Sequence, residues 1–581
     1  MKVTIIPATI LITSFVSCFF AYAHAIEFAL WLGVIASFVF AALGILRSHR
    51  ETEWLLIVVA FTISMRMPSF FQTYPWGFAA PMTDSAFDLT LSNLIRESGK
   101  WNPGMGFEVI KGYSYYPILH ILTAITSSVT GMDTTLLARI FPFFAEPLVV
   151  IFFYMSLRKI LSKEVAIWSS LIYNLNGNWH FWEYFIREFI ALVFFSMCLY
   201  LVLRMYTSRE GQRKFFVLGI IAAFMTVSSH HWTSYNLLVI LFVLAVFPTM
   251  YARIHAWLMN LRIHRIHQAS KDHKHLIMPS FLAIVFAMTF SWALHIGYSL
   301  FTVHSQNFLG FLINVVSPSP NFVEHPTMRL GFDTKILLYS GYLILGFLGV
   351  IELVRRFFER QKTYDDSIFE SWFVFSAVYI FAATFLLPSG GRWWTISWRS
   401  WGFAFFGLAP LVAIAITRYK KLKSKSTLHF KWLSSWKRLL PLILVFPLVS
   451  AVLTAPSEIL KPDYPRVDYS FYETALWVKH YLPNQRIALD RWSRSVVIPN
   501  GRAVTFEPLR WPGGETTFLN TIYQYENFSS ALSPAWQIVI FNKRISEWIP
   551  SASANSSILD PHYNRVHDSK SLAIYVIVAH D

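Results

Sequence analysis

Residues 187–204, which read REFIALVFFSMCLYLVLR, decide the fold class of this chain. The interior of this stretch carries no charge between Glu188 and Arg204, as a helix in the hydrocarbon core of a membrane requires. Similar apolar segments recur along all 581 residues, which are 55% hydrophobic and only 14% charged. Soluble domains carry roughly 25% charged residues. The sequence therefore predicts a mostly α-helical protein that crosses a membrane many times.

A spanning helix needs roughly 20 mostly apolar residues, and about thirteen segments approach that length. They lie near residues 3–22, 26–46, 54–71, 136–155, 165–179, 189–203, 215–229, 236–251, 276–301, 336–354, 368–387, 402–416 and 439–453. The first segment, with Lys2 before it and small residues near Ala25, also resembles a cleavable signal peptide. An uncleaved first helix is the preferred interpretation.

Basic residues mark every second gap between these segments, which fixes the predicted orientation. The gaps rich in Lys and Arg start at Arg47, Arg158, Arg204, Arg253, Arg355 and Arg418. By the positive-inside rule they face the cytoplasm. The opposite gaps then lie outside, namely residues 72–135, 180–188, 230–233, 304–335, 389–399 and everything after about residue 455.

The chain divides into a multi-pass transmembrane domain, residues 1–455, and a polar tail, residues 456–581. The tail has Pro, Gly and Asn clusters, a helical stretch over 472–481 and short β-like runs near 486–489, 495–498, 503–506, 538–541 and 573–578. It is predicted to be a small extracytoplasmic α/β domain.

The net charge of +16 would indicate nucleic acid in a soluble protein. Here the basic residues are loop anchors, so nucleic acid is not an expected partner. The sequence contains no Walker loop, no GxGxxG and no HExxH, which argues against a nucleotide-driven pump and a zincin protease. The two cysteines, Cys18 and Cys198, lie in apolar segments and offer no disulfide framework.

Two carboxylates in the first outer loop are the leading catalytic candidates. Asp84 and Asp88 are four residues apart, so on a helix they point the same way as Phe87, Leu91 and Ile95. Such a pair at a membrane surface suits a general base or half of a divalent-metal site. The structural alternative is a helix start, with Asp84 as N-cap or Ser85-x-x-Asp88 as a capping box.

Charged residues at the next outer turn form a second candidate group. Glu188 opens a transmembrane segment, where a carboxylate is costly unless it is paired or solvated. Arg187 precedes it and is spaced for a surface ion pair with Glu183. His120 lies in an amphipathic stretch expected to be an interfacial helix and is a weaker candidate for substrate binding.

Two further outer positions carry candidates for binding a phosphate or a sugar. His230 and His231 are adjacent at a membrane boundary, and because neighbouring residues face apart, hydrogen bonding is favoured over metal ligation. Arg392 and Arg399 are two helical turns apart and would share one face. Guanidinium groups at this depth suit a lipid phosphate, although interfacial anchoring is the alternative.

The candidate residues follow one another along the chain in an order that resembles the GT-C membrane glycosyltransferases. These enzymes take a sugar from a polyprenyl-phosphate carrier on the outer or luminal face. The resemblance covers roughly residues 54–418. It rests on Asp84-x-x-x-Asp88 with Gly99-Lys-Trp101, Tyr116-Pro117-x-x-His120, Arg187-Glu188 and His230-His231-x-Thr233. The oligosaccharyltransferase branch carries Trp-Trp-Asp-Tyr-Gly in its outer domain, where this chain has Asp490-Arg491-Trp492-Ser493-Arg494. A transferase of a single sugar, or a divergent member of the branch, is therefore favoured over sequon recognition.

The resemblance implies a hexosyltransferase-like enzyme with a polyprenyl- or dolichyl-phosphate sugar donor and a lipid, glycan or protein acceptor. Asp84, Asp88 and Glu188 are the implied catalytic residues. Those for binding are Arg187, His230, His231, Arg392, Arg399 and His120. If Mg²⁺ or Mn²⁺ is used, Asp84 and Glu188 are the expected ligands.

The expected location is the cell membrane, with the endoplasmic reticulum membrane as the alternative. An oligosaccharyltransferase or glycan ligase is the rival enzyme. A transporter or a scaffold presenting the tail is the rival outside enzymes. A transporter should carry charges near the bilayer midplane, whereas the charges here gather at the outer boundary.

Overall fold

The computed structural model describes residues 5–24, 27–48, 50–73, 83–103, 111–175, 185–208, 211–258, 274–298, 301–302, 305, 332–357, 364–386, 392–425, 469–482, 486–487, 504–505, 538–542, 563–568 and 572–577. The predicted span at 439–453 and the predicted strand at 495–498 lie outside these ranges. The chain forms two compact units. The first comprises Met1–Pro68, Phe143–Trp182 and Glu188–Ser457, and the second comprises Ser69–Pro142, Glu183–Arg187 and Glu458–Asp581.

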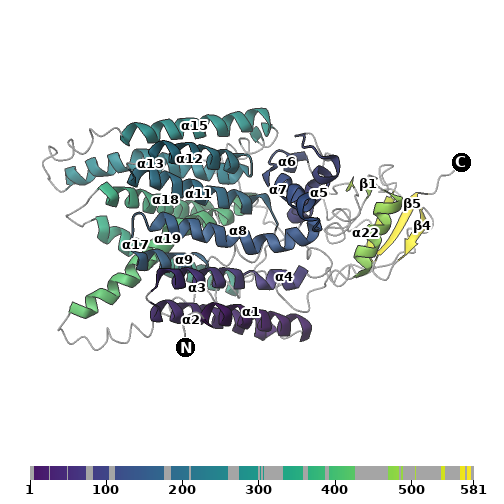
Figure 1. Ribbon diagram of the computed structural model, residues 1–581, viewed down its shortest axis with the longest axis horizontal. Coiled ribbons are helices and arrows are strands. Elements are labelled where there is room, and N and C mark those ends of the chain that lie inside the picture. The colour runs from purple at the N-terminus through teal and green to yellow at the C-terminus, as the bar shows by residue number, and fades with distance from the viewer. Residues whose placement is uncertain are drawn as a thin grey trace. The chain divides into compact units, whose positions relative to one another are not determined.

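The first unit is built of long apolar helices that lie alongside one another (Figure 1). Its helices, some of which begin in the second unit, are α1 (Ile5–His24), α2 (Glu27–Arg47), α3 (Glu51–Ser64), α4 (Met67–Thr73), α8 (Thr134–Leu157), α9 (Lys163–Tyr173), α11 (Arg187–Thr207), α12 (Gln212–Val227), α13 (His231–Leu258), α15 (Lys274–His295), α17 (Phe332–Phe357), α18 (Tyr364–Leu386) and α19 (Arg392–Lys425).

Within the described residues, five helices are long and apolar enough to cross a membrane, and further apolar helices are shorter. Large side chains on their outer faces stay exposed, such as Phe28 at 70% and Phe347 at 68%. Exposed apolar faces of this kind suit a hydrocarbon environment. The chain is thus a mostly helical protein with membrane-spanning character, while the number of thirteen spans stays a prediction.

The core of the first unit is an aromatic cluster. The Phe406 ring of α19 lies 5.1 Å from Phe153, 5.0 Å from Tyr173 and 5.3 Å from Phe195, between ring centroids. These contacts join α8, α9, α11 and α19 through edge-on and tilted pairs, the geometries aromatic rings prefer. Close helix packing continues at Gly407, because a Cβ added there would meet the Ser376 side chain of α18.

One predicted span is wrong in detail. Residues 54–71 were expected to form a single helix, but α3 ends at Ser64 and α4 begins at Met67. Pro68 has no N–H to donate to Ser64, so the helical hydrogen-bond ladder cannot run through this point. The interruption leaves Arg66 between the two helices.

The second unit contains the first outer loop. Here α5 (Thr83–Ser98) packs on α6 (Lys111–Ser114) and on α7 (Ile118–Thr130). Helix α7 is amphipathic, with Leu119, His120 and Thr123 on its buried side. It ends at Gly131, whose φ of 71° is the left-handed conformation that helix C-caps use.

The described pieces of residues 456–581 also belong to the second unit. They are α22 (Tyr469–Tyr481) and strands β1 (Arg486–Ile487), β2 (Val504–Thr505), β3 (Ile538–Asn542), β4 (Tyr563–Asp568) and β5 (Leu572–Ile577). Strands β1 and β2 pair in parallel, and β5 lies between β3 and β4 with antiparallel pairing on both sides. The central strand buries Leu572 and Ile574. The α/β domain as a whole stays a prediction.

Candidate functional site

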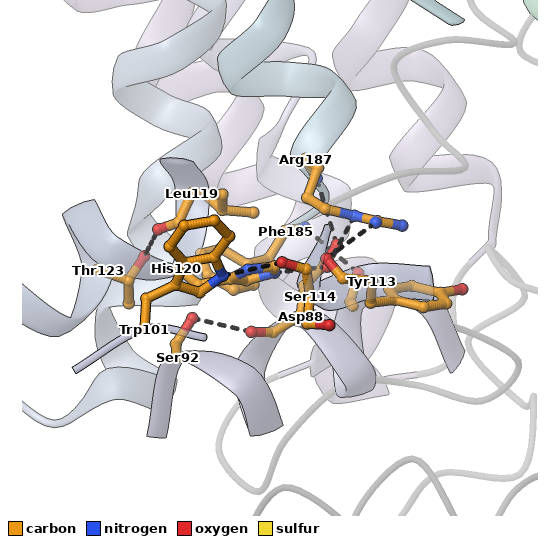
Figure 2. Close-up of polar contacts among 11 residues, drawn as sticks. Asp88, Ser92, Trp101, Tyr113, Ser114, Leu119, His120, Thr123, Phe185 and Arg187 are labelled. Carbon is orange, nitrogen blue, oxygen red and sulfur yellow. Dashed lines mark hydrogen bonds and ion pairs between the residues drawn. The ribbon is translucent and has the colours of Figure 1, made fainter. Parts of the chain in front are cut away.

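A buried carboxylate at the centre of the first outer loop organises the candidate site. Asp88 lies on α5 and is 0% exposed. Its Oδ1 atom is 2.8 Å from Nε2 of His120 on α7 and 3.0 Å from Nε of Arg187 (Figure 2). Its Oδ2 atom accepts a hydrogen bond from the backbone N–H of Arg187 at 3.2 Å. Two hydrogen bonds and one ion pair, from two distant segments, therefore converge on one carboxylate.

The segment that leads into α11 is held against α5 at two points. The N–H of Phe185 donates to the Ser85 hydroxyl at 3.4 Å, and the N–H of Arg187 donates to Asp88. Ser85 and Asp88 are three residues apart and so share a face of α5, which lets both receive N–H groups from residues 185–187. Because Arg187 is the first residue of α11, Asp88 also places a negative charge at the positive end of that helix.

The guanidinium of Arg187 has further contacts in the second unit. Its Nη1 donates to the backbone carbonyl of Tyr113 at 3.2 Å, and its Cζ lies 4.0 Å from the centre of the Tyr113 ring. That ring meets Phe87 edge-on at 5.1 Å. Arg187 is thus held by an anion, a carbonyl and an aromatic face, which orients its charge.

The surroundings of His120 favour its neutral form. It is 0% exposed, and burial lowers its pKa below the usual 6.5, opposed by Asp88 and reinforced by Arg187. Asp88 and Arg187 already balance each other, so a second cation would leave net charge in a buried place. The Nε2–H of the imidazole therefore donates to Asp88, and Nδ1 has no hydrogen-bond partner among the described residues.

A second buried carboxylate, Glu188, belongs to the first unit and forms a separate cluster there. It is 1% exposed, and its Oε1 lies 3.9 Å from Nδ1 of His230. His230 contacts the Thr233 hydroxyl at 3.0 Å and accepts from the Thr233 N–H at 3.4 Å, which fixes the ring at the start of α13. The neighbouring His231 ring lies 4.7 Å away and is partly exposed. The two histidines predicted to act together therefore have different surroundings: His230 is buried beside Glu188, whereas His231 is partly exposed.

For the remaining predicted site residues the structure describes the helix that contains them but not their side chains. Asp84 is in the first turn of α5, and Arg392 and Arg399 are in α19. Glu183, the expected ion-pair partner of Arg187, also lies outside the described residues. The alternative of a capping box at Ser85 does not form, because α5 begins at Thr83 and Asp88 turns to His120 and Arg187 instead.

A buried ion pair in the first unit was not among the predicted residues. Arg66 donates through Nε to Oε2 of Glu146 at 2.6 Å and through Nη2 to Oε1, with side chains only 1% and 4% exposed. Its guanidinium carbon also lies 4.5 Å from the centre of the Phe189 ring. Arg66 is the only charge in the predicted span 54–71, and Glu146 is one of two in the predicted span 136–155. Charges inside predicted apolar spans are the sequence signal that marks these residues.

No protein-family model matches the sequence, and no curated protein matches it. Solved structures do. The oligosaccharyltransferase of Archaeoglobus fulgidus in its apo form is 11% identical with a TM-score of 0.54, over 92% of this chain and 75% of that one. The same organism's AglB in complex with an inhibitory peptide and a dolichol-phosphate is 11% identical with a TM-score of 0.52, over 91% and 74%.

A third similar structure is the arabinofuranosyltransferase AftD from mycobacteria. It is 12% identical with a TM-score of 0.51, over 92% of this chain and 42% of that one. All three proteins are GT-C glycosyltransferases. At these identities the likeness concerns the fold, and it extends over nearly the whole chain. The chain therefore shares the fold of the GT-C membrane glycosyltransferases.

Proposed function

We propose that this chain is a membrane glycosyltransferase that transfers a sugar from a polyprenyl-phosphate-linked donor to an acceptor on the outer or luminal face. The observation that carries the proposal is the fold shared with AglB, whose structure contains a dolichol-phosphate, over 91% of this chain. A buried anion, cation and imidazole on two loops expected to face outward support the same conclusion.

The proposed reaction needs one proton acceptor and one stabilised leaving group. The acceptor hydroxyl loses its proton to a carboxylate as its oxygen attacks the anomeric carbon of the sugar. The bond between that carbon and the phosphate oxygen breaks, and the lipid phosphate leaves with the electron pair. Asp84 and Glu188 are the proposed bases, and Arg392 or Arg399 would stabilise the departing phosphate.

Asp88 has a different proposed role from that of Asp84. Both of its oxygens already face donors from His120 and Arg187, so it is poorly placed to take a proton from an acceptor. We assign Asp88, His120 and Arg187 to positioning. They hold the start of α11, and Glu188 is the next residue along the chain.

A divalent cation would stabilise the leaving phosphate, but the described residues alone do not build its site. No group of three His, Cys, Asp or Glu able to hold a metal occurs among them, and the Glu188–His230 pair offers at most two ligands. Mg²⁺ and Ca²⁺ take six or more oxygen ligands. The predicted role of Asp84 and Glu188 as Mg²⁺ or Mn²⁺ ligands therefore depends on Asp84 reaching that pair.

An oligosaccharyltransferase is the second candidate. The two similar structures from Archaeoglobus fulgidus favour it, because both are oligosaccharyltransferases. The match also includes a larger share of each of these proteins, 75% and 74%, than of AftD, 42%. The two activities differ in donor and acceptor. An oligosaccharyltransferase would use a lipid-linked oligosaccharide and a peptide, whereas the primary proposal expects a lipid-linked single sugar.

The proposal is tested with the full chain reconstituted in lipid nanodiscs. Polyprenyl-phosphate donors carrying a single radiolabelled sugar, and lipid-linked oligosaccharides with a peptide acceptor, are supplied in parallel, with total membrane lipid as a general acceptor. We expect transfer from a single-sugar donor, and its loss in Asp84→Asn and Glu188→Gln. Glu97→Gln is the matched control, because Glu97 is an exposed carboxylate on the same helix α5 as Asp84.

Transfer only from the oligosaccharide donor would establish the second candidate instead. Full activity in both Asp84→Asn and Glu188→Gln would refute the assigned bases. If folded wild-type protein, shown by a cooperative unfolding transition, transfers sugar from none of the donors, a transporter or a scaffold is favoured instead.

A further inference from the structure

A partly open cavity of about 380 Å³ lies in the first unit, and none of its lining residues belongs to the proposed reaction. It is lined by the segment before α9, by the end of α17 and by the last apolar turns of α19, with Arg355, Arg356 and Arg418 as its cationic residues. The one carboxylate in its wall is Glu164. By the positive-inside rule, these helix ends face the cytoplasm.

One arginine of the cavity wall, Arg356, is oriented by surrounding side chains. The Arg356 guanidinium carbon lies 4.6 Å from the centre of the Phe369 ring and 5.8 Å from that of Phe373. Its Nε is 3.4 Å from Oε1 of Glu352, and its Nη1 is 3.8 Å from Oε1 of Glu370. An arginine stacked and paired in this way loses little freedom when it binds a further anion.

The second arginine shares a carboxylate with the first. Arg355 donates through Nε to Oε2 of Glu352 at 2.9 Å. Glu352 is 3% exposed and Glu370 is 0% exposed, and neither lines the cavity. The cavity wall therefore carries three arginines and one carboxylate, while the buried Glu352 and Glu370 outside it hold the Arg355 and Arg356 side chains in place.

The mouth of the cavity has hydrogen-bonding groups of its own. Ser162 is the N-cap of α9, and its hydroxyl oxygen accepts from the Val165 N–H at 3.4 Å, so its own hydrogen can be donated elsewhere. The first turn of α9 also presents the positive end of the helix dipole. Both features favour an anion with several oxygens.

An apolar stripe on α17 leads up to this cationic end. Phe347, Val350, Ile351 and Val354 are 68%, 51%, 50% and 50% exposed, and their spacing places them on one face of the helix. From Ile344 to Val354 the helix rises about 15 Å, which is half of the roughly 30 Å hydrocarbon core and so the depth of one leaflet. The stripe ends one residue before Arg355.

We propose that the cavity binds the headgroup of an anionic phospholipid from the cytoplasmic leaflet, with an acyl chain along the apolar stripe of α17. Guanidinium groups bind phosphate oxygens through paired, charge-assisted hydrogen bonds. A free phosphate would satisfy the arginines but would leave the stripe unused, so the combination of the two features favours a lipid. The inference does not depend on the proposed glycosyl transfer.

Lipid binding is measured by native mass spectrometry of the full chain, titrated with phosphatidylglycerol or with phosphatidylcholine of the same chain length. We expect tighter binding of phosphatidylglycerol. Arg418→Gln should weaken it about tenfold, as loss of one charge-assisted hydrogen bond implies. Arg355→Gln should act in the same direction, and the unfolding temperature of each variant shows whether the fold is intact.

Two controls separate the source of the anion and the role of surface charge. Lys214→Gln removes an exposed charge from the first turn of α12, on the same predicted side, and should leave phosphatidylglycerol binding unchanged. Glycerol 3-phosphate at millimolar concentration should compete weakly, because it lacks the acyl chain. Val354→Asn should weaken lipid binding without removing any charge.

The proposal is overturned by any of three results. One is unchanged phosphatidylglycerol binding in folded Arg418→Gln and Arg355→Gln. Another is an equal loss in Lys214→Gln, which would indicate general surface electrostatics. The third is full displacement of the lipid by glycerol 3-phosphate together with wild-type binding in Val354→Asn, which would indicate a site for a free phosphate compound.

Discussion

Replacing Asp88 with Asn is the sharpest perturbation of the outer loop, because it changes charge and keeps shape. The carboxylate faces Nε2 of His120, the backbone N–H of Arg187 and the Arg187 guanidinium. An Asn side chain has only one accepting oxygen, and its NH₂ group would face donors. At least one of these donors is then left without an acceptor in a buried place.

The cost follows from the burial of both partners. Removing one member of a buried ion pair destabilises a protein by about 3–5 kcal/mol. The side chain of Asp88 is 1% exposed and that of Arg187 is 11% exposed. Arg187 keeps its contacts with the Tyr113 carbonyl and ring, which lowers the penalty. We therefore expect a loss near the lower end of the range, about 3 kcal/mol.

Stability is measured by tryptophan fluorescence during thermal and denaturant unfolding in detergent at one scan rate, since unfolding of such proteins is often irreversible. Glu97→Gln, an exposed change on the same helix, should stay within about 0.5 kcal/mol of the wild type. In a double-mutant cycle, Asp88→Asn and Arg187→Gln should couple by more than about 1 kcal/mol. Additive effects, or an Asp88→Asn variant as stable as Glu97→Gln, would refute the reasoning.

Three further predictions concern stability and are measured in the same unfolding experiments. Because burial holds the pKa of His120 below 6.5, the unfolded chain binds a proton near that pH while the folded chain resists it. The unfolding free energy should thus fall as pH drops below about 6.5, and His120→Gln should flatten this dependence; an identical pH profile would contradict it. Glu146→Gln should cost about 3–5 kcal/mol by leaving Arg66 uncompensated, and the double change Arg66→Met with Glu146→Leu should recover most of that loss. Gly131→Ala should cost about 1 kcal/mol, because its φ of 71° strains a side chain although no atom lies within 4 Å of the added Cβ, and no effect would show that the cap relaxes.

Much of the helical architecture follows from local pattern. The apolar runs at 136–155 and 189–203 lie within α8 and α11, because a membrane segment must close its own hydrogen bonds and helices do so locally. The break between α3 and α4 was missed even though Pro68 marks it, because the apolar run continues across it. Hydropathy alone does not register a lost backbone hydrogen bond.

The sequence was enough to predict which residues belong to the candidate site, but not which of them contact one another. Asp88, His120 and Arg187 were each singled out from the sequence, but not as partners of one another. The ion pair of Arg187 with Glu183 was the alternative to a functional role, and Glu183 lies outside the described residues. Arg187 contacts Asp88, which is 99 positions earlier in the chain. Spacing rules describe neighbours on one helix, whereas this cluster depends on how α5 and α7 pack against the segment before α11.

The contacts that complete the cluster had no sequence signal of their own. Tyr113 contributes a backbone carbonyl and a ring face, and any residue has the first of these. Ser85 accepts from the Phe185 N–H although it was considered only as part of a helix cap. Such roles are set by tertiary packing.

The proposed chemistry is tested most directly by an experimental structure of the full chain in nanodiscs with a polyprenyl phosphate bound. We predict that the phosphate lies in one cavity with the carboxylates of Asp84 and Glu188, within hydrogen-bond distance of Arg392 or Arg399. A phosphate bound elsewhere, or Asp84 and Glu188 opening onto separate surfaces with no shared cavity, would contradict the proposed glycosyl transfer.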